Sequence, residues 1–144
     1  MRHRRAIVAA LAATALTAVC ASVLLAQPSR KAAGDATRGQ QLFARSVCVS
    51  CHDITKPWPG GDVCPNLGNI ATEAARIVKL REYRGKAKDA AGYIRESIVD
   101  PNAYLVPGAN YRTAEGKSVM PQDIAKAFKP SELDDLVAYL LTRR

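Results

Sequence analysis

The feature that most constrains this chain is the pentapeptide Cys48-Val49-Ser50-Cys51-His52. A histidine directly after two cysteines three positions apart has the spacing that attaches a c-type haem. Cysteines at this spacing reach the two vinyl groups on one edge of a porphyrin, and the adjacent imidazole is carried over the ring to the iron. The pentapeptide therefore predicts one covalent haem c, held by Cys48 and Cys51, with His52 as an axial ligand.

Two other kinds of site use a C-x-x-C pair. A redox dithiol would sit in a βαβ setting, but no segment of this sequence alternates like a strand. A zinc site needs a second ligand pair, and after residue 26 the chain offers only Cys64 beyond the pentapeptide and no second histidine. The scarcity of aromatics, with one Trp and two Phe, also favours a large apolar cofactor at the centre of the fold.

The first residues are expected to direct export. A basic start, Met1 to Arg5, is followed by residues 6–26 without a single charge, which is typical of a signal peptide. The uncharged stretch is also long enough to cross a bilayer if it is not cleaved. The organisation expected is a signal peptide over 1–26, with a retained anchor as the alternative, a linker over 27–34 and a haem domain over 35–144. The location expected is the periplasm, either soluble or tethered to the membrane.

The charge of the exported chain suggests its partners. Residues 1–26 hold three of the 21 basic residues and none of the 13 acidic ones, which leaves a net charge of +5. A moderately basic surface favours redox proteins with acidic docking faces, or an anionic membrane surface. Lys and Arg are spread along the chain, so no nucleic-acid partner is expected. Some of the cations near the pentapeptide and Met120, namely Lys56, Arg112 and Lys117, are expected to steer acidic partners toward the haem.

Four helices are expected, joined by long loops. The first runs from a cap at Asp35 to about Arg45. The second begins near Thr72, with Ala75, Val78 and Lys79 following. The third carries apolar residues at helical spacing and stops at Pro101; they are Ala87, Ala91, Ile94 and Ile98. The fourth has Ser131 as N-cap and Asp134 in capping-box position, followed by an apolar stripe of Leu133, Leu136, Val137, Leu140 and Leu141.

The segments Asp53–Leu67 and 102–121 are rich in Pro and Gly and are expected to be loops. The fold class expected is therefore all-α, with short helices and long loops. Long ordered loops are unusual in a small domain unless something fills the space beneath them. One haem would do so.

The second axial ligand follows from what the chain contains. After residue 26 there is a single methionine, Met120, in the loop Ser118-Val119-Met120-Pro121. A lone Met is usually a packing residue, but this one lies in a Gly- and Pro-rich loop and has no rival as a ligand. A Met/His pair raises the reduction potential and leaves no open coordination position. The pair favours electron transfer over substrate activation.

The sequence resembles bacterial class I cytochromes c from about Asp35 to Thr142. The resemblance includes Gly39-x-x-x-Phe43, the pentapeptide Cys48 to His52, Pro65-Asn66-Leu67, Met120-Pro121 and a terminal helix with Tyr139. The stretch from Tyr93 to Asn102 is similar to small periplasmic monohaem cytochromes and to haem domains attached to oxidases.

The resemblance implies the class I cytochrome c fold, in which the first and last helices cross; Gly39, Phe43 and Tyr139 match the crossing positions. It also implies that the carbonyl of Pro65 accepts a hydrogen bond from the ring N–H of His52. One departure is Cys64, where the family usually has Gly. Cys64 is expected to be a buried small residue, with an intermolecular disulfide or a reactive thiol as alternatives. Candidates for contacts with the haem edge are Trp58, Tyr83, Tyr104, Tyr111, Arg81 and Arg84.

The function expected is one-electron transfer between redox partners, with the chain acting as a carrier and not as an enzyme. A haem subunit or domain of a periplasmic or membrane oxidoreductase complex is the alternative, with thiol or sulfur chemistry at Cys64. A second alternative is a gas sensor in which Met120 leaves the iron.

Overall fold

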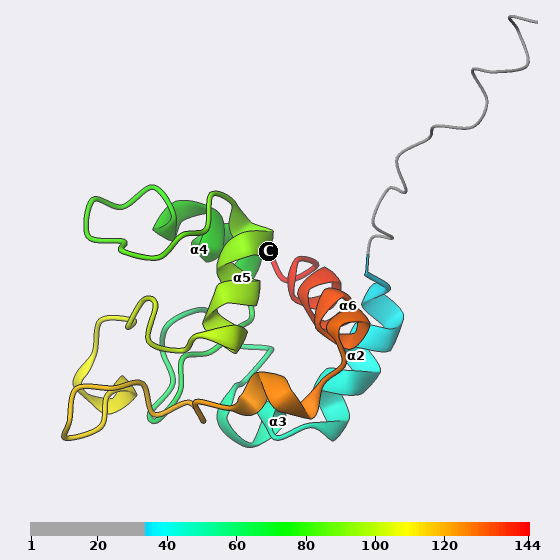
Figure 1. Cartoon of the computed structure of the whole chain (residues 1–144), viewed down its shortest axis with the longest axis horizontal. Helices are drawn as coiled ribbons and strands as arrows, with labels where there is room; N and C mark the ends of the chain where they lie inside the picture. Colours follow the sequence, from blue (N-terminus) through cyan, green and yellow to red (C-terminus); the bar gives the residue numbers. More distant parts are fainter. Residues whose placement is uncertain (1–33) are drawn as a thin grey trace, which may run out of the picture. The chain divides into compact units, whose positions relative to one another are not determined.

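The computed structural model describes residues 34–144, and the expected signal peptide or anchor over 1–26 and linker residues 27–33 lie outside that range. The described part is helical (Figure 1) and holds no strand, only an isolated bridge between Arg112 and Ser118. Its helices are α2 (Ala36–Arg45), α3 (Cys48–Cys51), α4 (Ile70–Ile77), α5 (Ala90–Val99) and α6 (Pro130–Leu140), with 3-10 turns η2 (Ala109–Tyr111) and η3 (Ile124–Ala127). The all-α prediction is confirmed. No helix in residues 34–144 is long and apolar enough to cross a membrane.

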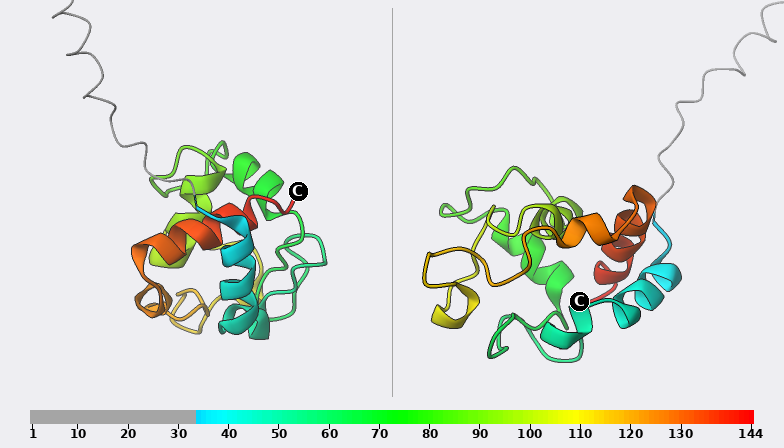
Figure 2. Two further views of the ribbon diagram at one scale, coloured as in Figure 1. Left: turned by 90° about the vertical axis from the view of Figure 1, so that its right-hand side faces the viewer. Right: turned by 60° about the horizontal axis from the view of Figure 1, so that its bottom comes forward.

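The first and last helices, α2 and α6, cross (Figures 1 and 2), and Gly39 lies at the crossing. A Cβ at Gly39 would come within 2.0 Å of the backbone oxygen of Asp135 and 2.8 Å of the Cβ of Tyr139. The rings of Phe43 and Tyr139 pack at the same crossing, with centroids 5.7 Å apart. The expected crossing residues are therefore confirmed, and the absence of a side chain at Gly39 sets how closely the helices approach.

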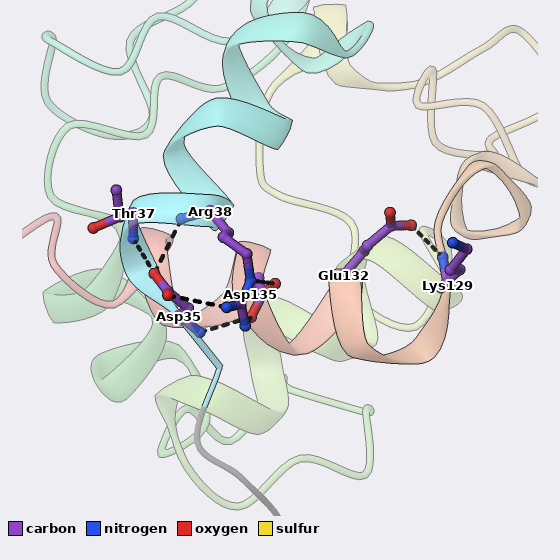
Figure 3. Close-up of polar contacts among 6 residues, drawn as sticks. All are labelled: Asp35, Thr37, Arg38, Lys129, Glu132 and Asp135. Carbon is purple, nitrogen blue, oxygen red and sulfur yellow. Dashed lines mark hydrogen bonds and ion pairs between the residues drawn. The ribbon is translucent and has the colours of Figure 1, made fainter.

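A polar clamp secures the crossing at the start of α2 (Figure 3). Asp35 is the N-cap, and its carboxylate accepts hydrogen bonds from the backbone N–H groups of Thr37 and Arg38. Asp135, 4% exposed, accepts from Arg38 Nε at 2.8 Å and from the N–H of Asp35 at 2.6 Å. The hydrogen bond from Arg38 holds the pKa of Asp135 below its usual value. The cap predicted at Asp35 is confirmed.

The start of the last helix differs from the prediction. The N-cap is Lys129, whose backbone N–H donates to the carboxylate of Glu132 at 2.7 Å (Figure 3). Ser131 lies inside the helix, so the predicted capping box with Asp134 is wrong. Pro130 explains the difference, because proline is favoured at the first helical position, where its missing N–H is not needed. Asp134 instead contacts Arg95 of α5.

The two middle helices, α4 and α5, begin at other residues than the sequence predicts. Helix α4 begins at Ile70, two residues before the expected start near Thr72, and buries Ile70, Ala71, Ala74 and Ile77. Helix α5 is capped by Asp89, whose side chain accepts from the N–H of Gly92 at 2.7 Å, so Ala87 lies outside it. Both helices were predicted, but their first residues were not: the Asp89 side chain caps α5, whereas Asn69 makes no side-chain cap at the start of α4.

The buried side chains of the helices form one core. Its members are Phe43 from α2, Ile70, Ala74 and Ile77 from α4, Tyr93 and Ile94 from α5, and Leu133, Leu136, Val137, Tyr139 and Leu140 from α6. The apolar stripe predicted for the last helix is thus buried, apart from Leu141, which packs against the core while partly exposed.

Gly39→Ala should destabilise the folded protein by about 1–3 kcal/mol, the usual cost of overpacking a tight contact. The new methyl group would collide with the backbone of α6, which cannot rotate away. Urea unfolding followed by circular dichroism measures the change. Gln40→Ala, an exposed position on the same helix, is the matched control and should change stability little. Equal stability of the two variants would contradict the close approach at Gly39.

Asp135→Asn should lower stability at pH 7 and flatten its dependence on acid pH. The pKa of Asp135 is depressed in the folded state, so its contribution is present above its unfolded pKa of about 3.9. That contribution is lost as the pH falls through the lower folded value. Thermal unfolding at pH 7, 5 and 3 should therefore show a deficit in the variant that shrinks toward low pH. A deficit that is the same at all three pH values would argue against an ionised Asp135 in the clamp.

Candidate functional site

The site begins at α3, the single helical turn formed by the pentapeptide. The N–H of His52 donates to the carbonyl of Cys48 at 2.9 Å, which closes the turn. Residues three positions apart lie on one side of a helix, so this turn carries Cys48 and Cys51 on the same side. Cys48 is half-buried, Cys51 is exposed, and neither is in a disulfide.

The ring of His52 is oriented by Pro65. His52 Nδ1 lies 2.7 Å from the carbonyl oxygen of Pro65. A carbonyl can only accept, so Nδ1 carries the proton and a neutral ring keeps its lone pair on Nε2. Burial lowers the pKa of His52, and the bond to Pro65 opposes that shift. The ring is therefore held with one nitrogen available to a metal, in the arrangement common for metal-binding histidines.

A hollow of about 770 Å³, partly open to solvent, lies beside His52. A second hollow of about 380 Å³ shares part of its lining. The residues common to both are His52, Leu67, Ile98, Met120 and Leu140. The imidazole predicted as one ligand and the thioether predicted as the other therefore line the same space.

The lining suits a large apolar group that carries iron. Most of its side chains are apolar, from α4, α5, α6 and the two loops; among them are Trp58, Leu67, Ile70, Ile94, Ile98, Leu105, Val106, Val119 and Leu140. Cys48 lines the second hollow, so a thiol reaches the same space. A c-type haem is attached through the two cysteines of a C-x-x-C-H motif, and its iron takes an imidazole nitrogen and can take a thioether sulfur. The residues present fit haem c.

Tyr111 joins the two loops that flank the hollow. Its hydroxyl lies 3.0 Å from the carbonyl of Pro59 and 2.8 Å from that of Gly61. It comes from η2 in the loop that also carries Met120, whereas Pro59 and Gly61 follow the pentapeptide. The sequence offered Tyr111 only as one of several candidates, because a bond between loops fifty residues apart leaves no local pattern.

The other candidates divide into two groups. Trp58 and Tyr104 line the hollow, as does Tyr93, a residue that the sequence reading used only for the family resemblance. The hollow's lining does not include Tyr83, Arg81 or Arg84. Arg81 and Arg84 are exposed.

Cys64 lies in the wall of the hollow and is only 4% exposed. Burial, together with the neighbouring Cys51, raises the pKa of the Cys64 thiol to about 12. A buried thiol with a raised pKa is a poor nucleophile. The expectation of a buried small residue at this position is confirmed.

The described residues give no support to the other uses of a C-x-x-C pair. In residues 34–144 no group of three or more His, Cys, Asp or Glu side chains could hold a metal ion. The same residues contain no strand that would form a βαβ unit around a redox dithiol.

Comparison with known protein families matches the family described as Cytochrome c over residues 36–144, well over half of the chain. No curated protein and no solved structure gives a significant match. Members of this family bind covalently attached haem c and transfer electrons through it. The matched range begins with α2, ends at the last residue, and contains the pentapeptide, the apolar hollow and the α2–α6 crossing, so the chain belongs to the cytochrome c family, as a class I c-type cytochrome with covalent haem c.

Proposed function

We propose that this cytochrome carries single electrons between proteins, with its haem attached at Cys48 and Cys51 and its iron ligated by His52 and Met120. The observation that carries the proposal is that His52 and Met120 line the same apolar hollow. The haem supplies a reversible one-electron change of its iron. A Met/His pair leaves no open position for a substrate, which favours a carrier over an enzyme.

The chain's own residues have three tasks in this function. Pro65 engages Nδ1 of His52, which leaves Nε2 to bind the iron. The apolar wall keeps water from the metal and favours the state of lower charge. The segment of Met120 is braced locally, because Gln122 Nε2 donates to its carbonyl at 2.8 Å and its own N–H bonds to the hydroxyl of Ser118.

The proposed setting is the periplasm, with the chain either free or tethered to the membrane. The support is the basic start and the uncharged stretch over 6–26, which are typical of an export signal. The proposed partners are redox proteins with acidic faces, because the chain after residue 26 carries a net charge of +5 and a basic surface attracts acidic ones.

The alternative, sulfur chemistry at Cys64 within an oxidoreductase, needs an accessible thiolate. The burial of Cys64 and its pKa of about 12 disfavour that state near neutral pH. The carrier function therefore accounts better for the site.

Met120→Ala should abolish the weak far-red absorption band of sulfur-to-iron charge transfer in the ferric protein. It should also lower the reduction potential, because the thioether raises it, and open the iron to imidazole. Absorption spectra, redox titration and imidazole binding measure these changes. Val119→Ala, its neighbour in the same wall of the hollow, is the matched control and should keep the band. A wild-type protein without the band would exclude Met120 as the ligand and leave Cys64 or a lysine in its place.

Cys64 in the folded protein should resist labelling by a thiol reagent and react only after denaturation, because its side chain is buried and its pKa is raised. Cys64→Ser should leave the spectrum and the rate of electron transfer within about twofold of wild type. Mass spectrometry of the labelled chain and stopped-flow reduction measure both. Rapid labelling of the native protein, or a tenfold loss of electron transfer in the variant, would favour the alternative at Cys64.

A further inference from the structure

The positive charge of the described chain is concentrated in one loop between α4 and α5. Residues 79–88, here called the cationic loop, contain five exposed cations and one acid, Glu82; the cations are Lys79, Arg81, Arg84, Lys86 and Lys88. The loop has a net charge of +4. Residues 34–144 hold 16 basic and 13 acidic residues, a net charge of +3, so everything outside the loop sums to −1. Lys and Arg occur along the whole sequence, but the net positive charge of the described residues lies in this loop.

The cations of the loop are not neutralised within the described residues. The ion pairs of residues 34–144 involve Arg38, Lys56, Arg76 and Arg95 and none of the five. Arg84 turns back to donate to backbone carbonyls of the loop itself. The large exposed apolar side chains, Val47, Val49, Val63 and Val99, lie elsewhere. The loop therefore presents a charged surface and not an apolar one.

Glu96 of α5 anchors the cationic loop. Its carboxylate accepts from the hydroxyl of Tyr83 and from the N–H of Lys86, the latter at 2.6 Å. The N–H of Ala87 donates to the Tyr83 hydroxyl at 3.1 Å. The charges are thus presented on a fixed backbone, which reduces the entropy lost when a partner binds.

Tyr83 connects the cationic loop to the wall of the hollow. Its ring packs on Tyr93 and Tyr104, with centroids 6.0 and 5.6 Å away, and those two rings are 6.2 Å apart. Both Tyr93 and Tyr104 line the large hollow. A continuous set of aromatic contacts therefore runs from the charged surface to the space that suits the haem.

The cationic loop and α3 lie at opposite ends of the described fold (Figures 1 and 2). The α3 side is electrically balanced, because residues 45–68 contain Arg45 and Lys56 against Asp53 and Asp62. Lys56 Nζ is also paired with Asp53 at 3.3 Å. An acidic partner is therefore attracted more strongly to the loop than to the pentapeptide.

We propose that the cationic loop docks an acidic redox protein and that the Tyr83–Tyr93–Tyr104 cluster couples this docking surface to the haem. The proposal rests on the proposed electron-carrier function. Electrons tunnel through the packed rings, and no tyrosine is oxidised. An anionic membrane would also be attracted to the cations, but the aromatic contacts behind the loop suit a partner that exchanges electrons there. A membrane surface exchanges no electrons, so these aromatic contacts would have no role in binding one.

The first test compares two charge reversals in the full, haem-loaded protein. Lys79→Glu/Lys88→Glu changes the loop, and Lys117→Glu/Lys126→Glu makes the same charge change at exposed positions around the Met120 loop. Reduction by an acidic flavodoxin at low ionic strength should slow about tenfold in the loop variant, within the range of electrostatic steering, and less than twofold in the control. The rates should converge at high salt.

Reduced riboflavin, a small neutral donor that needs no docking surface, separates failure of the electron-carrier function from failure of docking at the cationic loop. If riboflavin fails to reduce the wild-type protein, the electron-carrier function itself is wrong. If riboflavin reduces all variants equally but flavodoxin is slowed as much by Lys117→Glu/Lys126→Glu, docking occurs near Met120 and the loop proposal is overturned. Loss of binding to phosphatidylglycerol vesicles in the loop variant, with unchanged flavodoxin rates, would identify a membrane as the occupant and also overturn it.

The second test concerns the aromatic path. Tyr83→Phe and Tyr83→Leu both lose the hydroxyl that bonds Glu96, but only the former keeps the ring. At saturating flavodoxin the first-order rate of electron transfer should fall several-fold in Tyr83→Leu relative to Tyr83→Phe, while the far-red band stays unchanged in both. Equal first-order rates in the two variants would show that the ring of Tyr83 is not part of the path.

Discussion

The contact on which the site depends is the approach of α2 to α6 at Gly39. Only Ser46 and Val47 separate the end of α2 from α3, so the position of α2 fixes where Cys48 and Cys51 lie. From the other side of the crossing, Leu136 and Leu140 of α6 line the same space as Cys48. A side chain at Gly39 would push the helices apart and move the thiols relative to that wall. The helix crossing thus sets the geometry of cofactor attachment.

The remaining walls are long loops, and polar bonds hold them where helix packing cannot. The carbonyl of Pro65 binds the ring of His52, and the hydroxyl of Tyr111 binds the carbonyls of Pro59 and Gly61. Asn69 adds a further bond, because its side chain accepts from the N–H of Trp58 at 2.7 Å. The loop after the pentapeptide is therefore tied both to His52 and to the segment that carries Met120. Long loops of this kind are ordered only when such ties and an interior surface are available.

Features that depend on residues close together in the sequence could be predicted from local sequence patterns. The pentapeptide, the cap at Asp35 and the apolar stripe of the last helix each express a fixed spacing, and the structure has them as expected. The cap at Ser131 was wrong because Pro130 and Glu132 supply an alternative start two residues earlier. The first residue of α4 and the role of Tyr111 could not be predicted, since both depend on contacts with distant segments, such as the bond from Ala71 N–H to the carbonyl of Arg143.

The distribution of surface charge also could not be predicted from the sequence alone. A count of Lys and Arg gives the sign of the surface charge but not where on the surface the charge lies. A single cation near a motif does not predict a positive surface there when an acid lies beside it, as Asp53 does beside Lys56. The backbone of residues 79–88 is held in place by Glu96 of α5, whose carboxylate accepts a hydrogen bond from the N–H of Lys86. The same carboxylate holds Tyr83 against the aromatic wall of the hollow. One side chain therefore shapes both the electrostatic surface and the contact behind it. In the proposed docking mode, it would link the place where a partner binds to the path of its electron to the haem.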